Sequence, residues 1–198
     1  MSKRLNFDFS HRPLVPYAHD YAHGEAEPWH HHDCAQLIHT LSGVVKVETQ
    51  QGSWIVPPSR GVWLPAGTHH ALHIVGVVAA RTLFVDPLAR ADLPASCQVV
   101  QVSPLLRELI VSALALPEVY APASRAERIY ELILDEIRVM TELPFSLPEP
   151  QSEGLVALCN ALRAAPGESW TLENSARRIN VSSRTLARRF YQETGLQF

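Results

Sequence analysis

Two short groups of histidines in the first half of the chain have the spacing of metal ligands. The first is His30-His31-His32, and the second is His69-His70, which follows a turn at Pro65-Ala66-Gly67. In a β-strand, residues two apart point to the same face, so His30 and His32 can share one target. The turn would return a second strand towards that target. Two imidazoles from one strand and one from another are typical ligands of a mononuclear divalent transition-metal site.

Arginines near the C-terminus form a second group of residues with a recognisable chemistry. Residues 170–198 contain five arginines and two glutamates, a net charge of +3. Thr171 is a good N-cap for a first short helix, and Asn180 tolerates the left-handed conformation that a tight corner needs. Ser182 or Ser183 would cap a second helix. The pattern therefore predicts two short helices joined by a corner.

The second of these helices is predicted to expose a basic face. Leu186 and Phe190 are four residues apart and face inward. The side chains that remain outward are Arg184, Thr185, Arg188 and Arg189. This is typical of a helix-turn-helix, whose second helix enters the DNA major groove, where arginine can pair with guanine or grip phosphate. The alternative is a surface helix hairpin with a solvated basic face.

The histidines must be positioned by the strands predicted between residues 36 and 102. Short apolar segments recur there, separated by turn residues such as Ser42-Gly43 and Pro57-Pro58. Segments 36–39 and 44–48 are each predicted to form a separate strand, and so are 71–75 and 82–85. Many short strands at regular intervals indicate a sandwich or barrel rather than a parallel sheet.

Two amphipathic helices and a linker are predicted between the barrel and the arginine-rich segment. Ser103 would cap a helix that begins with Pro104, and Ser124 would cap a second one. Each has an apolar stripe that can pack on the barrel, and one could pair with a second subunit. Residues 141–152 contain three prolines and read as a semi-rigid linker.

The segment from Trp170 to Gly195 resembles the first helix-turn-helix of the AraC family of transcription regulators. Its pieces are T-L-E-x-x-A, V-S-x-R-x-L-x-R-x-F and T-G. The resemblance implies a homodimer that binds double-stranded DNA. It places Arg184 and Arg188 at the bases and Thr171 and Arg189 at phosphates, and we add two neighbours on the same helix, Ser183 and Thr185. Family members carry a second helix-turn-helix, but this chain stops three residues past Gly195. We therefore expect DNA binding to need the complete C-terminal domain.

The histidine segments are similar to the two motifs of the cupins. Gly24-x5-His30-x-His32-x3-Gln36-x6-Gly43 resembles the first motif, with Gln36 where catalytic members have Glu, and Pro65-x-Gly67-x2-His70 resembles the second. The resemblance implies that His30, His32 and His70 are ligands of a divalent transition metal (Zn, Ni, Fe or Mn), with Gln36 a weak fourth. A neutral amide lowers affinity for a hard dication. The same residues could bind an organic effector without metal, or be structural.

Three further residues are predicted to contact a small-molecule effector. Trp29 precedes the first histidine pair and is a candidate pocket wall, while His39 and Arg81 are candidate polar contacts. Against an enzymatic role, Glu25 and Glu27 precede the predicted strand, so no carboxylate occupies a motif position as a ligand or base.

The bulk composition is that of a soluble cytoplasmic protein. The formal net charge is −3, so the residues before 170 carry −6 and the basic character is concentrated at the C-terminal end. The longest apolar run is far too short to span a bilayer. The odd number of cysteines, at positions 34, 97 and 159, indicates reduced thiols in a cytosolic protein.

These observations predict an α+β protein with four parts. They are a cupin-like sensor barrel or double-stranded β-helix (residues 1–102), a helical pair with a dimerisation role (103–140), a linker (141–152) and the first half of an all-α DNA-binding domain (153–198). The predicted function is a ligand-responsive transcription regulator. The alternatives are a metal-dependent cupin enzyme (oxygenase, isomerase or hydrolase) and an oligomerisation module, which would have no use for the arginine helix.

Overall fold

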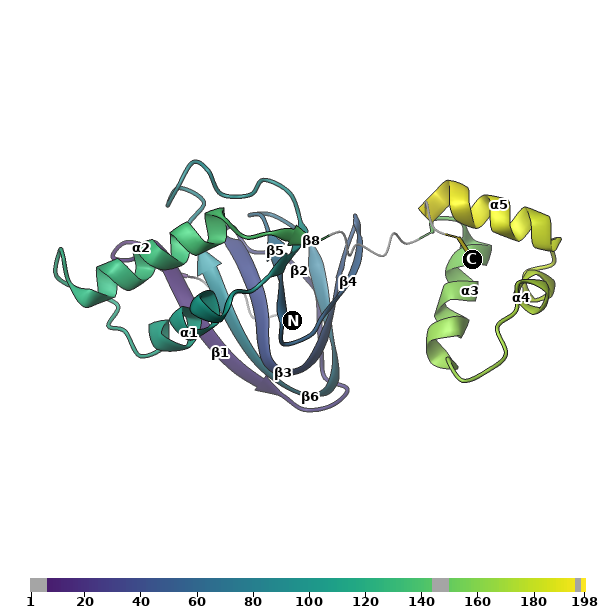
Figure 1. The fold of residues 1–198 in the computed structure, drawn as a ribbon, viewed down its shortest axis with the longest axis horizontal. Coiled ribbons are helices and arrows are strands. Elements are labelled where there is room, and N and C mark those ends of the chain that lie inside the picture. Colours follow the sequence, from purple (N-terminus) through teal and green to yellow (C-terminus); the bar gives the residue numbers. More distant parts are fainter. Residues whose placement is uncertain (1–6, 144–149, 195–196) are drawn as a thin grey trace. The chain divides into compact units, whose positions relative to one another are not determined.

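The computed structural model describes residues 7–143, 150–194 and 197–198, which form two compact units (Figure 1). Half of the predicted linker (residues 144–149) and the predicted motif position Gly195 therefore lie outside the described residues.

The first unit is built on one eight-stranded sheet among the residues that the structure describes. The order along it is β1-β6-β3-β5-β7-β8, with β2 also paired to β6 and β4 to β3. Strand β6 pairs antiparallel with β1, β2 and β3. The strands are β1 (Leu14–Tyr21), β2 (Ala26–His30), β3 (Ala35–Thr49), β4 (Gly52–Val56), β5 (Arg60–Leu64), β6 (His70–Val85), β7 (Gln98–Gln101) and β8 (Glu142–Leu143).

Strands β3 and β6 are each longer than the sequence predicted. Segments 36–39 and 44–48 both belong to β3, and segments 71–75 and 82–85 both belong to β6. The prediction of separate strands is therefore wrong. The turn signal at Ser42-Gly43 marks register shifts inside β3. Gly43 has a φ of 75° there, and an added Cβ would lie 2.3 Å from the Val77 carbonyl oxygen. Glycine lets the long strand bend without ending it.

Two apolar cores lie on opposite faces of this sheet. Ile38 packs inside the barrel with Val47, Trp54 and other side chains, whereas Leu37 faces the helices α1 (Pro104–Ala113) and α2 (Arg125–Arg138). Both helices lie against one flank of the sheet (Figure 1). Their predicted N-caps, Ser103 and Ser124, accept hydrogen bonds from backbone N–H groups of the first turn, as expected.

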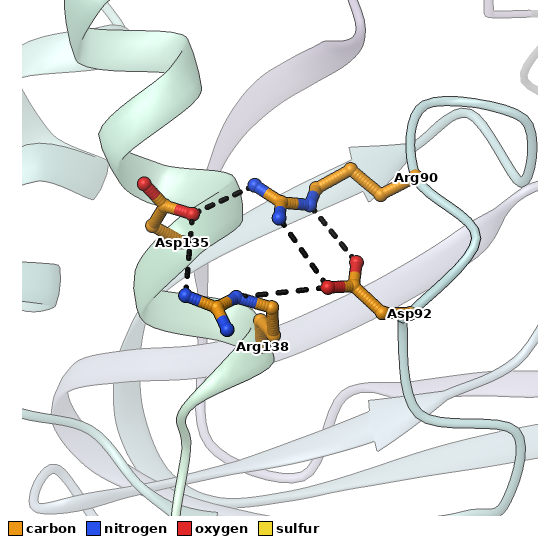
Figure 2. Close-up of polar contacts among 4 residues, drawn as sticks. All are labelled: Arg90, Asp92, Asp135 and Arg138. Carbon is orange, nitrogen blue, oxygen red and sulfur yellow. Dashed lines mark hydrogen bonds and ion pairs between the residues drawn. The ribbon is translucent and has the colours of Figure 1, made fainter.

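A four-residue ion-pair network attaches the loop between β6 and β7 to α2 (Figure 2). Arg90 donates to Asp92 at 2.9 Å and to Asp135 of α2 at 2.7 Å. Arg138 completes the network at 3.7 Å from each carboxylate. The network thus links the loop to the last turns of α2.

The second unit consists of three helices over a small core. They are α3 (Glu153–Ala164), α4 (Leu172–Arg178) and α5 (Ser183–Thr194). Leu155, Leu158, Ala176 and Leu186 are its buried apolar residues. The α+β fold class predicted from the sequence is confirmed. None of the helices in the described parts of the chain has the length and hydrophobicity to cross a bilayer.

Candidate functional site

The predicted histidine ligands converge where β2 ends and β6 begins. His30 is the last residue of β2 and pairs with His70, the first residue of β6. His32 lies just beyond the strand, and its carbonyl accepts a 2.8 Å hydrogen bond from the Gly67 backbone. These backbone contacts hold the two segments together independently of the side chains.

The three imidazoles form a compact group. One ring nitrogen from each of His30, His32 and His70 lies within 4.8 Å of the other two. The ring centroids of His30 and His70 are 4.3 Å apart, those of His30 and His32 are 4.9 Å apart, and those of His32 and His70 are 5.6 Å apart. This is the only such group of three or more metal-ligating residues within the described part of the chain.

Hydrogen bonds fix which nitrogen of two of these rings is free. His30 Nδ1 donates to the Pro28 carbonyl at 2.7 Å, and His70 Nδ1 donates to the Thr68 carbonyl at 2.9 Å, because a carbonyl can only accept. In the neutral ring each Nε2 then carries no proton, and its lone pair can bind a metal. Such backbone partners commonly orient histidines that ligate metals.

Two polar atoms at this site are buried without a hydrogen-bond partner among the described residues, His70 Nε2 and Gln36 Oε1. A buried polar atom without a partner costs about 1–3 kcal/mol, and an ion or a water is a common explanation for one. A cation held by the three histidines would give His70 Nε2 a partner. The donor set therefore fits a divalent transition metal.

Burial favours the unprotonated, metal-binding form of His32 and His70. It lowers the pKa of His32 to about 4, with the neighbouring His30 as the second cause, and it also lowers the pKa of His70 to about 4. Both rings are neutral at pH 7, so metal binding at that pH would not have to displace protons from them.

The barrel interior has little free space beside this group. The cavity lined by His32, Gln36, Glu27 and Tyr21 has a volume of about 20 Å³. That is room for about one water or ion, far below the ~300 Å³ of a typical organic-ligand pocket. A larger cavity of about 250 Å³ also borders His32, and its other lining residues are Phe7, Phe9, Asp33, Cys34, Asp86 and Pro87.

A second candidate site is the exposed face of α5. Asn180 has a φ of 56°, as the predicted corner requires. Of the two predicted caps, Ser182 accepts from the Thr185 backbone at 3.1 Å. Leu186 is fully buried, while Arg184, Arg188 and Arg189 are exposed. Thr171 caps α4 by accepting from the Asn174 backbone. The predicted basic face therefore exists on this unit.

Residues 14–142 match the family described as the AraC-like ligand binding domain. The chain belongs to this family. The AraC family predicted from the sequence is thereby confirmed.

The chain is also similar to several individual proteins. The HTH-type transcriptional regulator NimR of Escherichia coli K12 is 28% identical over 204 residues, which cover the whole chain and 74% of NimR. Among solved structures, ToxT from Vibrio cholerae is similar with a TM-score of 0.48 at 6% identity, covering 94% of this chain and 78% of ToxT. A cupin superfamily protein from Desulfitobacterium hafniense has a TM-score of 0.33 at 14% identity, covering 40% of this chain and 84% of that protein.

The three predicted effector contacts are not among the residues that line the two cavities beside His32. Trp29 is 53% exposed. His39 points to the same face as Leu37, away from Gln36, and is fully buried with its Nδ1 donating to the Arg60 carbonyl. Arg81 pairs with Asp20 at 2.8 Å. Because alternate strand residues face opposite sides, His39 could not share a face with Gln36.

Sequence reasoning missed Glu27, which it placed before the strand. The residue lies within β2, and its Oε2 is 3.6 Å from His30 Nε2. Its Oε1 accepts a hydrogen bond from the Tyr21 hydroxyl. Glu27 and His30 are three positions apart, so a regular strand would put them on opposite faces, but a register shift between them changes this. No signal in the sequence marks that bulge.

Proposed function

We propose that this chain is a ligand-responsive, DNA-binding transcription regulator of the cytoplasm that acts as a homodimer. Its AraC-like domain senses a small molecule, and its second unit contacts double-stranded DNA. Family membership supports the sensing role. The observation that carries the DNA-binding role is the group of exposed arginines on α5, directly after the corner at Asn180.

On this proposal α5 is the recognition helix. Arg184 and Arg188 are one turn apart, so their guanidinium groups leave the same face and can reach neighbouring base edges. Neither forms an ion pair within the described parts of the chain, so both are free to bind a polyanion. Arg189, Thr171, Ser183 and Thr185 border this face and would contact phosphates or position the helix.

The proposed sensor site is the histidine group, with His30, His32 and His70 as ligands of a divalent transition metal and Gln36 as a weaker donor. A bound ion would offer an open coordination position to a donor atom of the effector. The inner cavity of about 20 Å³ is too small for an organic effector. We propose that the effector occupies the 250 Å³ cavity, which shares His32 with the inner one.

On this proposal, effector binding in this cavity is transmitted to α2 through the loop that follows β6. Asp86 and Pro87 line the cavity at the start of the loop, and Arg90 and Asp92 fasten the same loop to the end of α2 (Figure 2). Control of DNA binding requires that the effector bind the two states of the protein with different affinity. Helices α1 and α2 are the proposed dimer contacts.

Operator binding tests this function. We expect Arg184→Ala and Arg188→Ala, made in the protein with its complete DNA-binding domain, each to weaken specific binding by roughly 1–3 kcal/mol and to relax sequence preference. Arg163→Ala on α3 is the control, since it removes the same charge from the same unit, and it should change affinity little. Unchanged affinity and preference in both α5 variants would remove these residues from DNA recognition.

Glu27 gives one reason to retain a metal-dependent enzyme as the second candidate, because a carboxylate beside three histidines can act as a base. Turnover of a screened oxygenase or hydrolase substrate that is lost in His32→Ala would favour it. The regulator remains the better-supported proposal because an enzyme does not account for the basic face of α5.

A further inference from the structure

The predicted ligand set leaves the charge of a bound cation uncompensated. His30, His32 and His70 are neutral donors, and Gln36 is a neutral amide. A divalent ion held only by these groups would bring two positive charges to a largely enclosed site, and an uncompensated charge in such a place is costly. Glu27 is the only acidic residue among those that line the inner cavity in the described structure.

The position of the Glu27 carboxylate matches that of a ligand. Zinc binds nitrogen and oxygen donors at about 2.0–2.2 Å, so two donors on one tetrahedral ion lie roughly 3.3–3.5 Å apart. Glu27 Oε2 is already 3.6 Å from His30 Nε2. His30 Nδ1 is bound to a carbonyl, so it is the free Nε2 that faces the carboxylate.

The second oxygen of Glu27 is held in place by Tyr21. This tyrosine lies on β1, its side chain belongs to the inner core of the barrel, and the residue is only 8% exposed. Its hydroxyl donates to Glu27 Oε1. Carboxylates that ligate metals are commonly hydrogen-bonded on their other oxygen. The Glu27 side chain retains 39% exposure, which places it at the solvent side of the group.

We propose that Glu27, rather than Gln36, supplies the anionic ligand of this site, and that Tyr21 is its positioning residue. The inference rests on the proposed metal site. The carboxylate that catalytic cupins have at the position of Gln36 is thus replaced by one from the preceding strand, and Glu27 and Gln36 line the same inner cavity.

Metal affinity of the full chain tests the proposal. Binding of Zn²⁺ and Co²⁺ would be measured by competition with a chromophoric chelator. We expect Glu27→Gln to weaken binding at least about tenfold, and Tyr21→Phe to weaken it less. Gln36→Ala should cost less than Glu27→Gln. The matched control is Glu25→Gln, which changes an exposed carboxylate two residues earlier that accepts from the Ala22 backbone and should leave affinity unchanged.

The visible spectrum of bound Co²⁺ gives a readout that does not depend on affinity. Loss of a carboxylate ligand changes the coordination and so shifts the ligand-field bands in Glu27→Gln but not in Glu25→Gln. If Glu27→Gln binds as tightly as the parent with the same spectrum, the proposal is overturned. If Glu27→Gln does not fold, Tyr21→Phe decides, and unchanged affinity and spectrum there overturn it.

Failure of the metal site itself would look different. In that case the parent chain would bind neither ion more tightly than His30→Ala or His70→Ala. If the parent binds metal through the histidines and Glu27→Gln does not change that binding, the proposed metal site stands and only the ligand role of Glu27 is excluded.

Discussion

His39 is a buried histidine that takes no part in the histidine group. The His39 side chain is fully buried, and burial lowers its pKa from the usual 6.5. Its Nδ1 donates to the Arg60 carbonyl, and Arg107 of α1 adds a repulsive charge to the protonated form. The folded protein therefore holds His39 neutral.

This makes the stability of the first unit depend on pH through His39. Above about pH 6.5 the ring is neutral in both states, so it adds no pH dependence. As the pH falls below that value, the unfolded chain binds a proton that the folded chain does not, and stability is lost. His39→Asn keeps a donor for the Arg60 carbonyl but does not titrate. We expect the stability difference between parent and variant to narrow from pH 7.5 to pH 5 in urea unfolding.

His32 and His70 titrate in both proteins and cancel in that comparison. A difference that is constant with pH for His39→Asn would show that His39 does not carry the effect.

The histidine group predicts a stabilisation by metal. An ion that binds only the folded state stabilises it by RT ln(1 + [L]/Kd), about 2.7 kcal/mol at 100 times Kd. We expect the melting temperature of Zn²⁺-loaded protein to fall on dialysis against a chelator. His70→Ala should show a much smaller fall, since the ring with the buried unpaired Nε2 is gone. Equal shifts in the two proteins would argue against the site.

At the level of elements, the bend in β3 depends on Gly43. An added Cβ would meet the Val77 carbonyl oxygen at 2.3 Å and the Val78 side chain at 2.6 Å. The φ of 75° is also unfavourable for other residues. We expect Gly43→Ala to destabilise the first unit by more than ~1 kcal/mol, measured by denaturant unfolding.

Gly67 provides the control for this prediction. It has a similar φ of 77°, but no atom lies within 4 Å of an added Cβ. Gly67→Ala should therefore cost only the backbone strain, which is less than the cost of Gly43→Ala. The reverse order would contradict the close approach at the bend.

At the level of the whole molecule, the proposed regulator must link its sensor site to its DNA-binding unit. Allosteric coupling is reciprocal, so a metal or effector that changes operator affinity by some factor must have its own affinity changed by the same factor when operator DNA is bound. Typical couplings are about 1–3 kcal/mol, or roughly 5- to 150-fold. We expect Zn²⁺ affinity, measured by chelator competition, to change within this range when operator DNA is added.

Two variants test separately the DNA-binding step and the route of this coupling. Arg188→Ala should abolish the effect of DNA on metal affinity by weakening DNA binding itself. Asp135→Ala, which breaks the network of Figure 2, should leave both separate affinities nearly unchanged and reduce the coupling. Coupling that is undiminished in Asp135→Ala would exclude the loop as the route.

The sequence by itself determined the features that depend on near neighbours. Ser103, Ser124 and Thr171 cap helices as predicted, because a cap needs only the next three residues. The corner at Asn180 and the inward position of Leu186 follow from local periodicity. These local patterns are also those that carry the resemblance to the family.

The sequence motifs named the three histidines, but only the tertiary structure decided which other residues share their site. The histidines come together because β2 pairs with β6 across 40 residues of sequence. The bulge in β2 places Glu27 beside His30. The bend at Gly43 lets the two segments predicted as separate strands form the single strand β3. A single extra residue in a strand exchanges its two faces, and whether it is accommodated depends on the partner strand. Such long-range pairing leaves no mark in the local sequence.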